Sequence, residues 1–271
     1  MAGAESGLCL SQLLGAVSRA CGSSEGTRRT SRPLSPRAAA MSAAALPMYD
    51  WPEVRVETLA FWQGIRARVP GLPELSHPVE MDDLLAIWRD RRTVMTECCW
   101  GTVDLGMCTA QQILAQRSYD GVHGGEGIYY RSALIMRQGI SAQPGQRAVI
   151  PDGIQHLPWA ANQPDSRSGW LGIAEDAALS AERVLWTGAH RASIRAVAEG
   201  QADIAAIDCL SWQLAQAYEP AAQGLVVVGW TAPRPGIFFT TGLDSPPDLV
   251  AALRAALLAM GQYPAEEPAH A

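Results

Sequence analysis

Two serines and a glycine stand close together where the sequence predicts the start of a helix. Ser166, Ser168 and Gly169 lie in the stretch NQPDSRSGW, and a helix is predicted over residues 168–178. A helix start offers unpaired backbone N–H groups and about half a positive charge, so it attracts anions. Serine hydroxyls can donate further hydrogen bonds, and glycine lets the backbone approach a ligand closely. The simpler interpretation is that a serine only caps the helix.

Two more polar turns connect predicted strands to predicted helices, at residues 49–51 and 187–190. In an open α/β sheet, ligands bind where strand ends meet helix starts. His190 and Asp208 each stand at such a position, so they are candidates for the same site. His190 could equally be a capping or surface histidine. Asp208 could equally be the N-cap of a helix over residues 209–218.

Apolar runs that read as strands alternate with amphipathic segments that read as helices. This order predicts an α/β protein with helices on both faces of open sheets. The segment 101–106 reads as a loop. The expected strands are residues 43–48, 93–96, 128–137, 147–150, 156–161, 183–187, 203–208, 225–230 and 237–241, and the expected helices end near 67, 90, 178, 199, 218 and 260.

The composition argues against several functional classes. Acidic residues outnumber basic ones, 27 to 21, and the chain has no lysine, which argues against a nucleic-acid-binding protein. The six cysteines form no CxxC pair typical of zinc sites, and nothing indicates a cofactor. Cys98 or Cys99 could pair with His123 as a nucleophile and base, but no third group orients them. The cysteines otherwise read as small buried residues, with a reactive or redox role as the alternative.

The two ends of the chain differ from its middle. Residues 1–40 are rich in Ser, Arg and Pro from residue 18 onward and read as a disordered leader or a mis-started N-terminus. The globular part is expected to begin near Met41, and residues 263–271 read as a disordered tail. No apolar run approaches the roughly 20 residues of a membrane-spanning helix.

The order of the motifs resembles the phosphate/phosphonate-binding family of ABC-importer substrate-binding proteins. In that family, N-x-P-x-S-x-S-G opens a helix and is followed by G-x-H, A-V-x-x-G and A-D-x-A-x-x-D. These motifs fall here at residues 162–169, 188–190, 196–200 and 202–208, and the resemblance covers residues 43–260.

The resemblance implies a two-lobed class II periplasmic-binding-protein fold, in which each lobe is an open mixed sheet flanked by helices. By this analogy, lobe one comprises residues 43–140 and 225–262, and lobe two comprises residues 141–224.

The family also implies a site between the lobes. Ser166, Arg167, Ser168 and His190 would contact the anion, while Asp208 would face the ligand or orient a donor. Aromatic residues of lobe one would close the cleft, among them Tyr49 and Tyr129 or Tyr130. The ligand-binding residues predicted in this way are Tyr49, Tyr130, Ser166, Arg167, Ser168, Gly169, His190 and Asp208.

The resemblance implies a monomeric, non-catalytic periplasmic protein that captures phosphate, phosphite or a phosphonate and meets the permease subunits of an ABC transporter. Relatives often have Thr where this chain has Arg167, and a Q-T-C-G turn where it has Glu97 to Trp100. Glu97 would disfavour a dianion, and Trp100 would narrow the cleft. No clear export signal is present, so the alternative is a cytosolic sensor or an enzyme on the same fold. Such a protein could bind another organic molecule through its aromatic residues.

Overall fold

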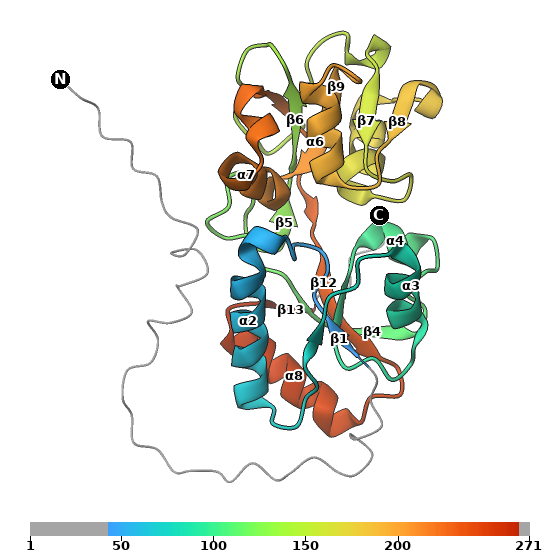
Figure 1. Ribbon diagram of the computed structural model, residues 1–271, viewed down its shortest axis with the longest axis vertical. Coiled ribbons are helices and arrows are strands. Elements are labelled where there is room, and N and C mark those ends of the chain that lie inside the picture. Colours follow the sequence, from blue (N-terminus) through green and yellow to red (C-terminus); the bar gives the residue numbers. More distant parts are fainter. Residues whose placement is uncertain (1–42, 266–271) are drawn as a thin grey trace, which may run out of the picture.

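The computed structural model describes residues 43–265, which fold into two lobes, each built around its own β-sheet (Figure 1). The chain builds most of one lobe, crosses to the other, and returns to complete the first with α8 (Pro247–Ala259). The predicted α/β, two-lobed fold class is confirmed. The leader predicted over residues 1–40 lies outside the described residues. No helix within residues 43–265 is both long and apolar enough to cross a membrane.

Lobe one contains a four-stranded sheet in the order β13-β4-β12-β3, with β1 joined to its edge by the parallel bridge between Ala44 and Met95. Phe238 and Phe239 on β12 point to opposite faces, because side chains alternate along a strand. Helices α2 and α8 cover the Phe239 face, and α3 covers the Phe238 face. The strands are β1 (Ala44–Ala45), β2 (Leu75–Ser76), β3 (Thr96–Cys98), β4 (Gln111–Gln116), β12 (Phe238–Gly242) and β13 (Tyr263–Pro264). The helical segments are η3 (Pro52–Val54), α2 (Arg55–Arg68), α3 (Met81–Arg89), α4 (Trp100–Asp104) and α8.

Lobe two contains a five-stranded mixed sheet in the order β10-β6-β9-β7-β8. Along β9, Ala205 and Ile207 face one core, and Ile204 and Ala206 face the other. Both faces are therefore buried, which explains why this strand reads as a continuous apolar run. The strands are β6 (Ser132–Met136), β7 (Trp159–Ala161), β8 (Val184–Trp186), β9 (Ile204–Asp208) and β10 (Val226–Trp230). The helical segments are η4 (Ile154–His156), η5 (Arg167–Leu171, a π-helix), α5 (Gly172–Ala177), η6 (Ala181–Arg183), α6 (His190–Ala198), α7 (Cys209–Tyr218) and η7 (Pro220–Gly224).

Two chain crossings join the lobes and pair with one another. β5 (Tyr129–Tyr130) and β11 (Arg234–Pro235) form a short antiparallel ribbon between the sheets. The predicted lobe boundaries need correction here. β6 and β10 were expected in lobe one, but β6 pairs with both β9 and β10, so the two strands belong to the lobe-two sheet.

Other sequence-based expectations differ locally from the structure. β4 was not predicted, and α4 occupies most of a segment expected to be a loop. The strand expected over residues 147–150 is a single bridge between Val149 and Trp230. The start of the tail expected to be disordered is ordered, because Tyr263 and Pro264 pair with β4 as β13. Residues 266–271 of that tail lie outside the described part of the chain.

Candidate functional site

A small pocket of about 30 Å³ lies where the two lobes and their crossings meet. A cavity of this size holds about two water molecules, because one water occupies roughly 10–15 Å³ on this measure. Only a small ligand therefore fits without movement of the walls. The lining residues are Tyr49, Cys99, Trp100, Tyr119, Tyr130, Arg167, Ser168, Asp208, Pro235, Gly236 and Ile237.

The predicted site residues divide into two groups. Five of them line the pocket: Tyr49, Tyr130, Arg167, Ser168 and Asp208. The other three lie behind its wall and hold it in place: Ser166, Gly169 and His190.

Ser166 caps the helix, as the simpler interpretation held. Its Oγ accepts a hydrogen bond from the backbone N–H of Gly169 at 3.0 Å. Gly169 also lies close to the protein itself: a Cβ at this position would lie 1.8 Å from the side-chain Oδ1 of Asn162. Of the two serines, Ser168 is the one that lines the pocket.

Ser168, His190 and Asp208 form a contact chain centred on one ring nitrogen. Nε2 of His190 lies 2.9 Å from Oγ of Ser168 and 3.3 Å from Oδ2 of Asp208. The other oxygen of Asp208, Oδ1, accepts from the backbone N–H groups of Leu210 and Ser211 and so caps α7. Burial lowers the pKa of His190, although the nearby Asp208 carboxylate opposes this shift. At neutral pH the histidine is therefore an uncharged hydrogen-bonding support for Ser168.

Three tyrosines form the aromatic wall of the pocket. The hydroxyls of Tyr49 and Tyr119 are 3.0 Å apart, and that of Tyr119 accepts the backbone N–H of Ile237 at 3.1 Å. Burial raises the pKa of all three phenols, Tyr130 included, and the charge of Asp208 adds to the shift. The phenols are therefore neutral at physiological pH. One O–H of the Tyr49–Tyr119 pair is used between the two rings, which leaves the other O–H of that pair and the O–H of Tyr130 to donate to an oxyanion.

Trp100 supplies a donor that the sequence analysis did not predict. Its side chain lines the pocket, and its buried Nε1–H has no hydrogen-bond partner among the described residues. A buried donor without a partner is costly, so such a group in a pocket wall marks a place for a ligand acceptor. Its position at the first residue of α4 was hidden because that segment read as a loop.

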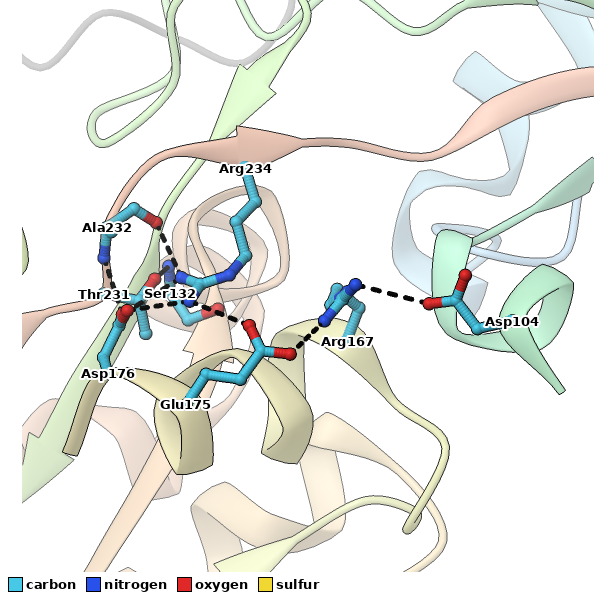
Figure 2. A network of polar contacts seen from close by, with 8 residues as sticks. All are labelled: Asp104, Ser132, Arg167, Glu175, Asp176, Thr231, Ala232 and Arg234. Atoms are coloured by element: carbon cyan, nitrogen blue, oxygen red, sulfur yellow. Dashed lines mark hydrogen bonds and ion pairs between the residues drawn. The ribbon is translucent and has the colours of Figure 1, made fainter. Parts of the chain in front are cut away.

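Arg167 lines the pocket, but its guanidinium pairs with carboxylates of the protein (Figure 2). Nη1 donates to Glu175 on α5, and Nη2 reaches across to Oδ2 of Asp104 on α4 at 3.3 Å. Arg167 thus connects lobe two with lobe one beside the pocket, in addition to placing a positive charge in its wall.

Glu97 was expected to repel a dianion, but its charge is neutralised within lobe one. It is fully buried, pairs with Arg117 at 2.5 Å and accepts the backbone N–H of Met48 at 3.1 Å. It also does not line the pocket. Asp208 is the acidic residue among those that line the pocket. No cluster of three or more His, Cys, Asp or Glu side chains that could hold a metal ion occurs within residues 43–265.

Comparison with solved structures shows the same fold in several proteins. PhnD1 from Prochlorococcus marinus, in complex with methylphosphonate, aligns with a TM-score of 0.61 at 12% identity, covering 80% of this chain and 83% of that one. A binding protein component of an ABC phosphonate transporter from Pseudomonas aeruginosa aligns with a TM-score of 0.59 at 14% identity, covering 82% and 80%. The periplasmic VFT2 domain of BvgS from Bordetella pertussis aligns with a TM-score of 0.55 at 17% identity, covering 84% and 94%.

Comparison at the level of sequence gives a more specific result. A search among curated proteins finds no significant match to this chain. The profile of one family, described as the periplasmic substrate-binding protein of phosphonate ABC transporters, matches residues 100–270. That range includes the serine-rich helix start, His190 and Asp208. The chain therefore belongs to the family of periplasmic phosphonate-binding proteins of ABC transporters.

Proposed function

We propose that this protein captures a small phosphorus oxyanion, such as methylphosphonate, phosphite or phosphate, in the pocket between its lobes. The observation that carries the proposal is the set of donors in a pocket of about 30 Å³. These are the neutral phenols, Ser168 at a helix start and the unpartnered Nε1–H of Trp100. A tetrahedral oxyanion has acceptors for several converging donors, and it requires less opening of the walls than a larger organic molecule.

Asp208 sets a condition on the protonation of the ligand. A carboxylate and a phosphonate dianion in one small pocket repel each other, whereas a monoanion with one remaining O–H can donate to the carboxylate. Oδ2 of Asp208 is the oxygen available for this contact, since Oδ1 accepts two backbone N–H groups and caps α7, whereas Oδ2 has the single contact of 3.3 Å with Nε2 of His190. Affinity is therefore expected to fall as pH rises through the second pKa of the ligand.

The contact chain of Ser168, His190 and Asp208 supports binding rather than catalysis. In a Ser-His-Asp triad, the serine and the aspartate contact different ring nitrogens, so that the aspartate orients the histidine toward the serine. Here Ser168 and Asp208 both contact Nε2 of His190, and Nδ1 has no partner among the described residues. The histidine is not placed to relay a proton from the serine. Members of the family act as substrate-binding proteins.

We further propose that the protein works as a periplasmic monomer that presents its ligand to the permease of an ABC importer. The family description supports both the compartment and the partner. Cell fractionation tests the location. Recovery in the cytoplasmic fraction would instead favour the sensor alternative.

Thermal unfolding with added ligands tests the binding function. Methylphosphonate, phosphite and phosphate are compared with sulfate and acetate at equal ionic strength. A ligand at 100 times its Kd adds about 2.7 kcal/mol to stability, so a Tm rise of roughly 5–10 °C is expected. If no phosphorus oxyanion raises Tm, the proposal is wrong.

Replacing Trp100 with Phe tests the role of its N–H group. The ring is largely kept and one donor to a charged acceptor is lost, so affinity should fall about 10-fold or more by calorimetry. Trp88→Phe is the matched control. That indole donates to the backbone oxygen of Glu97 at 2.9 Å, and Trp88 does not line the pocket. The control should lower Tm but leave affinity unchanged, whereas equal affinity in Trp100→Phe would exclude this donor from the site.

A further inference from the structure

Cys98 and Cys108 bring their sulfur atoms to 2.9 Å from each other within lobe one. Cys98 ends β3, and Cys108 follows α4. The two cysteines are thus the first and last residues of the segment 98–108, which we call the pocket segment. Both side chains are buried, and both thiols are free. We propose that Cys98 and Cys108 form a reversible disulfide that fixes the pocket segment.

Among the four cysteines within residues 43–265, the geometry favours a disulfide between these two sulfurs over the other combinations. An S–S bond is about 2.05 Å long, so the sulfurs need to approach by only about 0.9 Å. Cys99 is less well placed: its Sγ contacts the hydroxyl of Thr102 at 3.8 Å, and that hydroxyl, which also lies 3.4 Å from Sγ of Cys108, separates the two sulfurs. Cys209 belongs to α7 in the other lobe. A metal site would need further ligands, and the described residues offer no cluster of three.

The pocket segment carries the residues through which lobe one meets both the ligand pocket and lobe two. Cys99 and Trp100 line the pocket, and Asp104 pairs with Arg167. Gly101 packs so closely on lobe two that a Cβ would lie 1.9 Å from the backbone oxygen of Asp165. A covalent link between the ends of this segment would therefore hold one complete wall of the cleft in place.

The two thiols are unequal in a way that suits thiol–disulfide exchange. The hydrogen bond with Cys98 lowers the pKa of Cys108, whereas burial raises the pKa of Cys98. Cys108 is therefore the attacking thiolate toward a low-molecular-weight disulfide such as oxidised glutathione.

The exchange proceeds in two steps. In the first, the Cys108 sulfur bonds to one glutathione sulfur, and the other glutathione leaves as a thiolate. In the second, Cys98 loses its proton, its sulfur attacks that of Cys108, and the second glutathione leaves. The protein loses two protons and two electrons, and one glutathione disulfide gains them to become two glutathione thiols. Disulfides persist in oxidising compartments, of which the bacterial periplasm is one.

Peptide mapping of the full chain after oxidation by glutathione disulfide tests the link without any substitution. Trypsin cuts after Arg92 and Arg117, and cleavage before Asp104 separates Cys98 and Cys99 from Cys108. Peptides 93–103 and 104–117 should be recovered joined, two hydrogens lighter than their sum, and should separate on reduction. Separate peptides after oxidation would overturn the proposal.

Serine substitutions then identify the partner and its effect. Cys98→Ser should abolish the joined product, while Cys99→Ser and the control Cys209→Ala should keep it. A link that survives in Cys98→Ser would assign the bond to Cys99 and refute the proposed pair. Oxidation should also raise Tm by roughly 5 °C in the unsubstituted chain and in Cys209→Ala, but not in Cys108→Ser. An unchanged Tm on oxidation would show that the bond does not fix the segment.

Discussion

Two arginines join the lobes, and their surroundings differ. Arg191 on α6 reaches Glu53 of lobe one with two contacts, Nη2 to Oε1 at 2.8 Å and Nη1 to Oε2 at 3.1 Å. It also pairs with the buried Glu219 at 2.6 Å and lies 4.7 Å from the ring centre of Trp51. Arg167 reaches lobe one through one contact of 3.3 Å to Asp104, a residue whose side chain is 53% exposed.

The difference shows that neighbouring positions in a binding motif can have separate tasks. Each arginine stands beside a residue of the predicted anion site, Arg191 after His190 and Arg167 before Ser168. Only Arg167 lines the pocket, whereas Arg191 is held by several partners outside it. We infer that the Arg191 contact anchors the two lobes, while the Arg167 contact mainly sets the electrostatic potential of the pocket.

Arg191→Met should have the largest effect on stability. The change removes a two-contact ion pair, a hydrogen bond to Glu219 and a cation–π contact with Trp51. Arg195 still pairs with Glu219, so that carboxylate is not left alone. We expect the free energy of unfolding to fall by about 2 kcal/mol in urea titrations. A loss below about 0.5 kcal/mol would remove the distinction between the two arginines.

Glu219, which pairs with Arg191, should make the free energy of unfolding depend on pH in the acid range. Burial acts to raise the pKa of Glu219, but hydrogen bonds from Arg195 and Arg191 outweigh it and lower the pKa to about 2. The unfolded carboxyl has its ordinary pKa, about 4.3, so this stabilisation is complete above that value and is lost as pH falls toward 2. Glu219→Gln should flatten the dependence of unfolding free energy on pH over that window. An unaltered slope would mean that other carboxylates dominate.

Strands that are buried on both faces were predicted well from the sequence. Strands whose polar side chains form hydrogen bonds with distant parts of the fold were not. Residues 203–208 read as a strand because their apolar side chains enter two cores. β4 begins and ends with glutamines, and the Gln111 amide donates to backbone oxygens of Trp88 and Asp90. That polar strand is stabilised from another part of the fold, which no local pattern records.

The candidate site, like the fold, could be predicted only in part. The order of motifs placed Ser168 and Asp208 at the pocket, since both stand at helix starts that follow strands. Local pattern could not show that Arg167 pairs across the cleft with Asp104 or that Gly101 packs against Asp165. Those contacts depend on how the two lobes meet.

Arg167→Met should change ligand affinity more than stability. Removing the guanidinium leaves Asp104 and Glu175 beside the pocket without their shared cation, although Arg234 still contacts Glu175 at 3.3 Å. The remaining negative charge repels an oxyanion, so affinity should fall about 5-fold at low salt. The loss should shrink near 1 M salt, where the Debye length is about 3 Å. A salt-independent loss would indicate a direct contact with the ligand instead.

Asp104→Asn should have the smallest effect and most directly tests the weaker contact. The ion pair that it breaks is single and solvent-exposed, and such pairs contribute about 0–1 kcal/mol. Urea titrations should therefore show a change in the free energy of unfolding below about 0.5 kcal/mol.

The lost negative charge near the pocket should raise the affinity of Asp104→Asn for an oxyanion about 2-fold at low salt. In a double-mutant cycle with Arg167→Met, the coupling energy in unfolding should stay below about 0.5 kcal/mol. A coupling of 1 kcal/mol or more would make this contact an anchor like the one at Arg191, because only a well-ordered pair gives a coupling of that size.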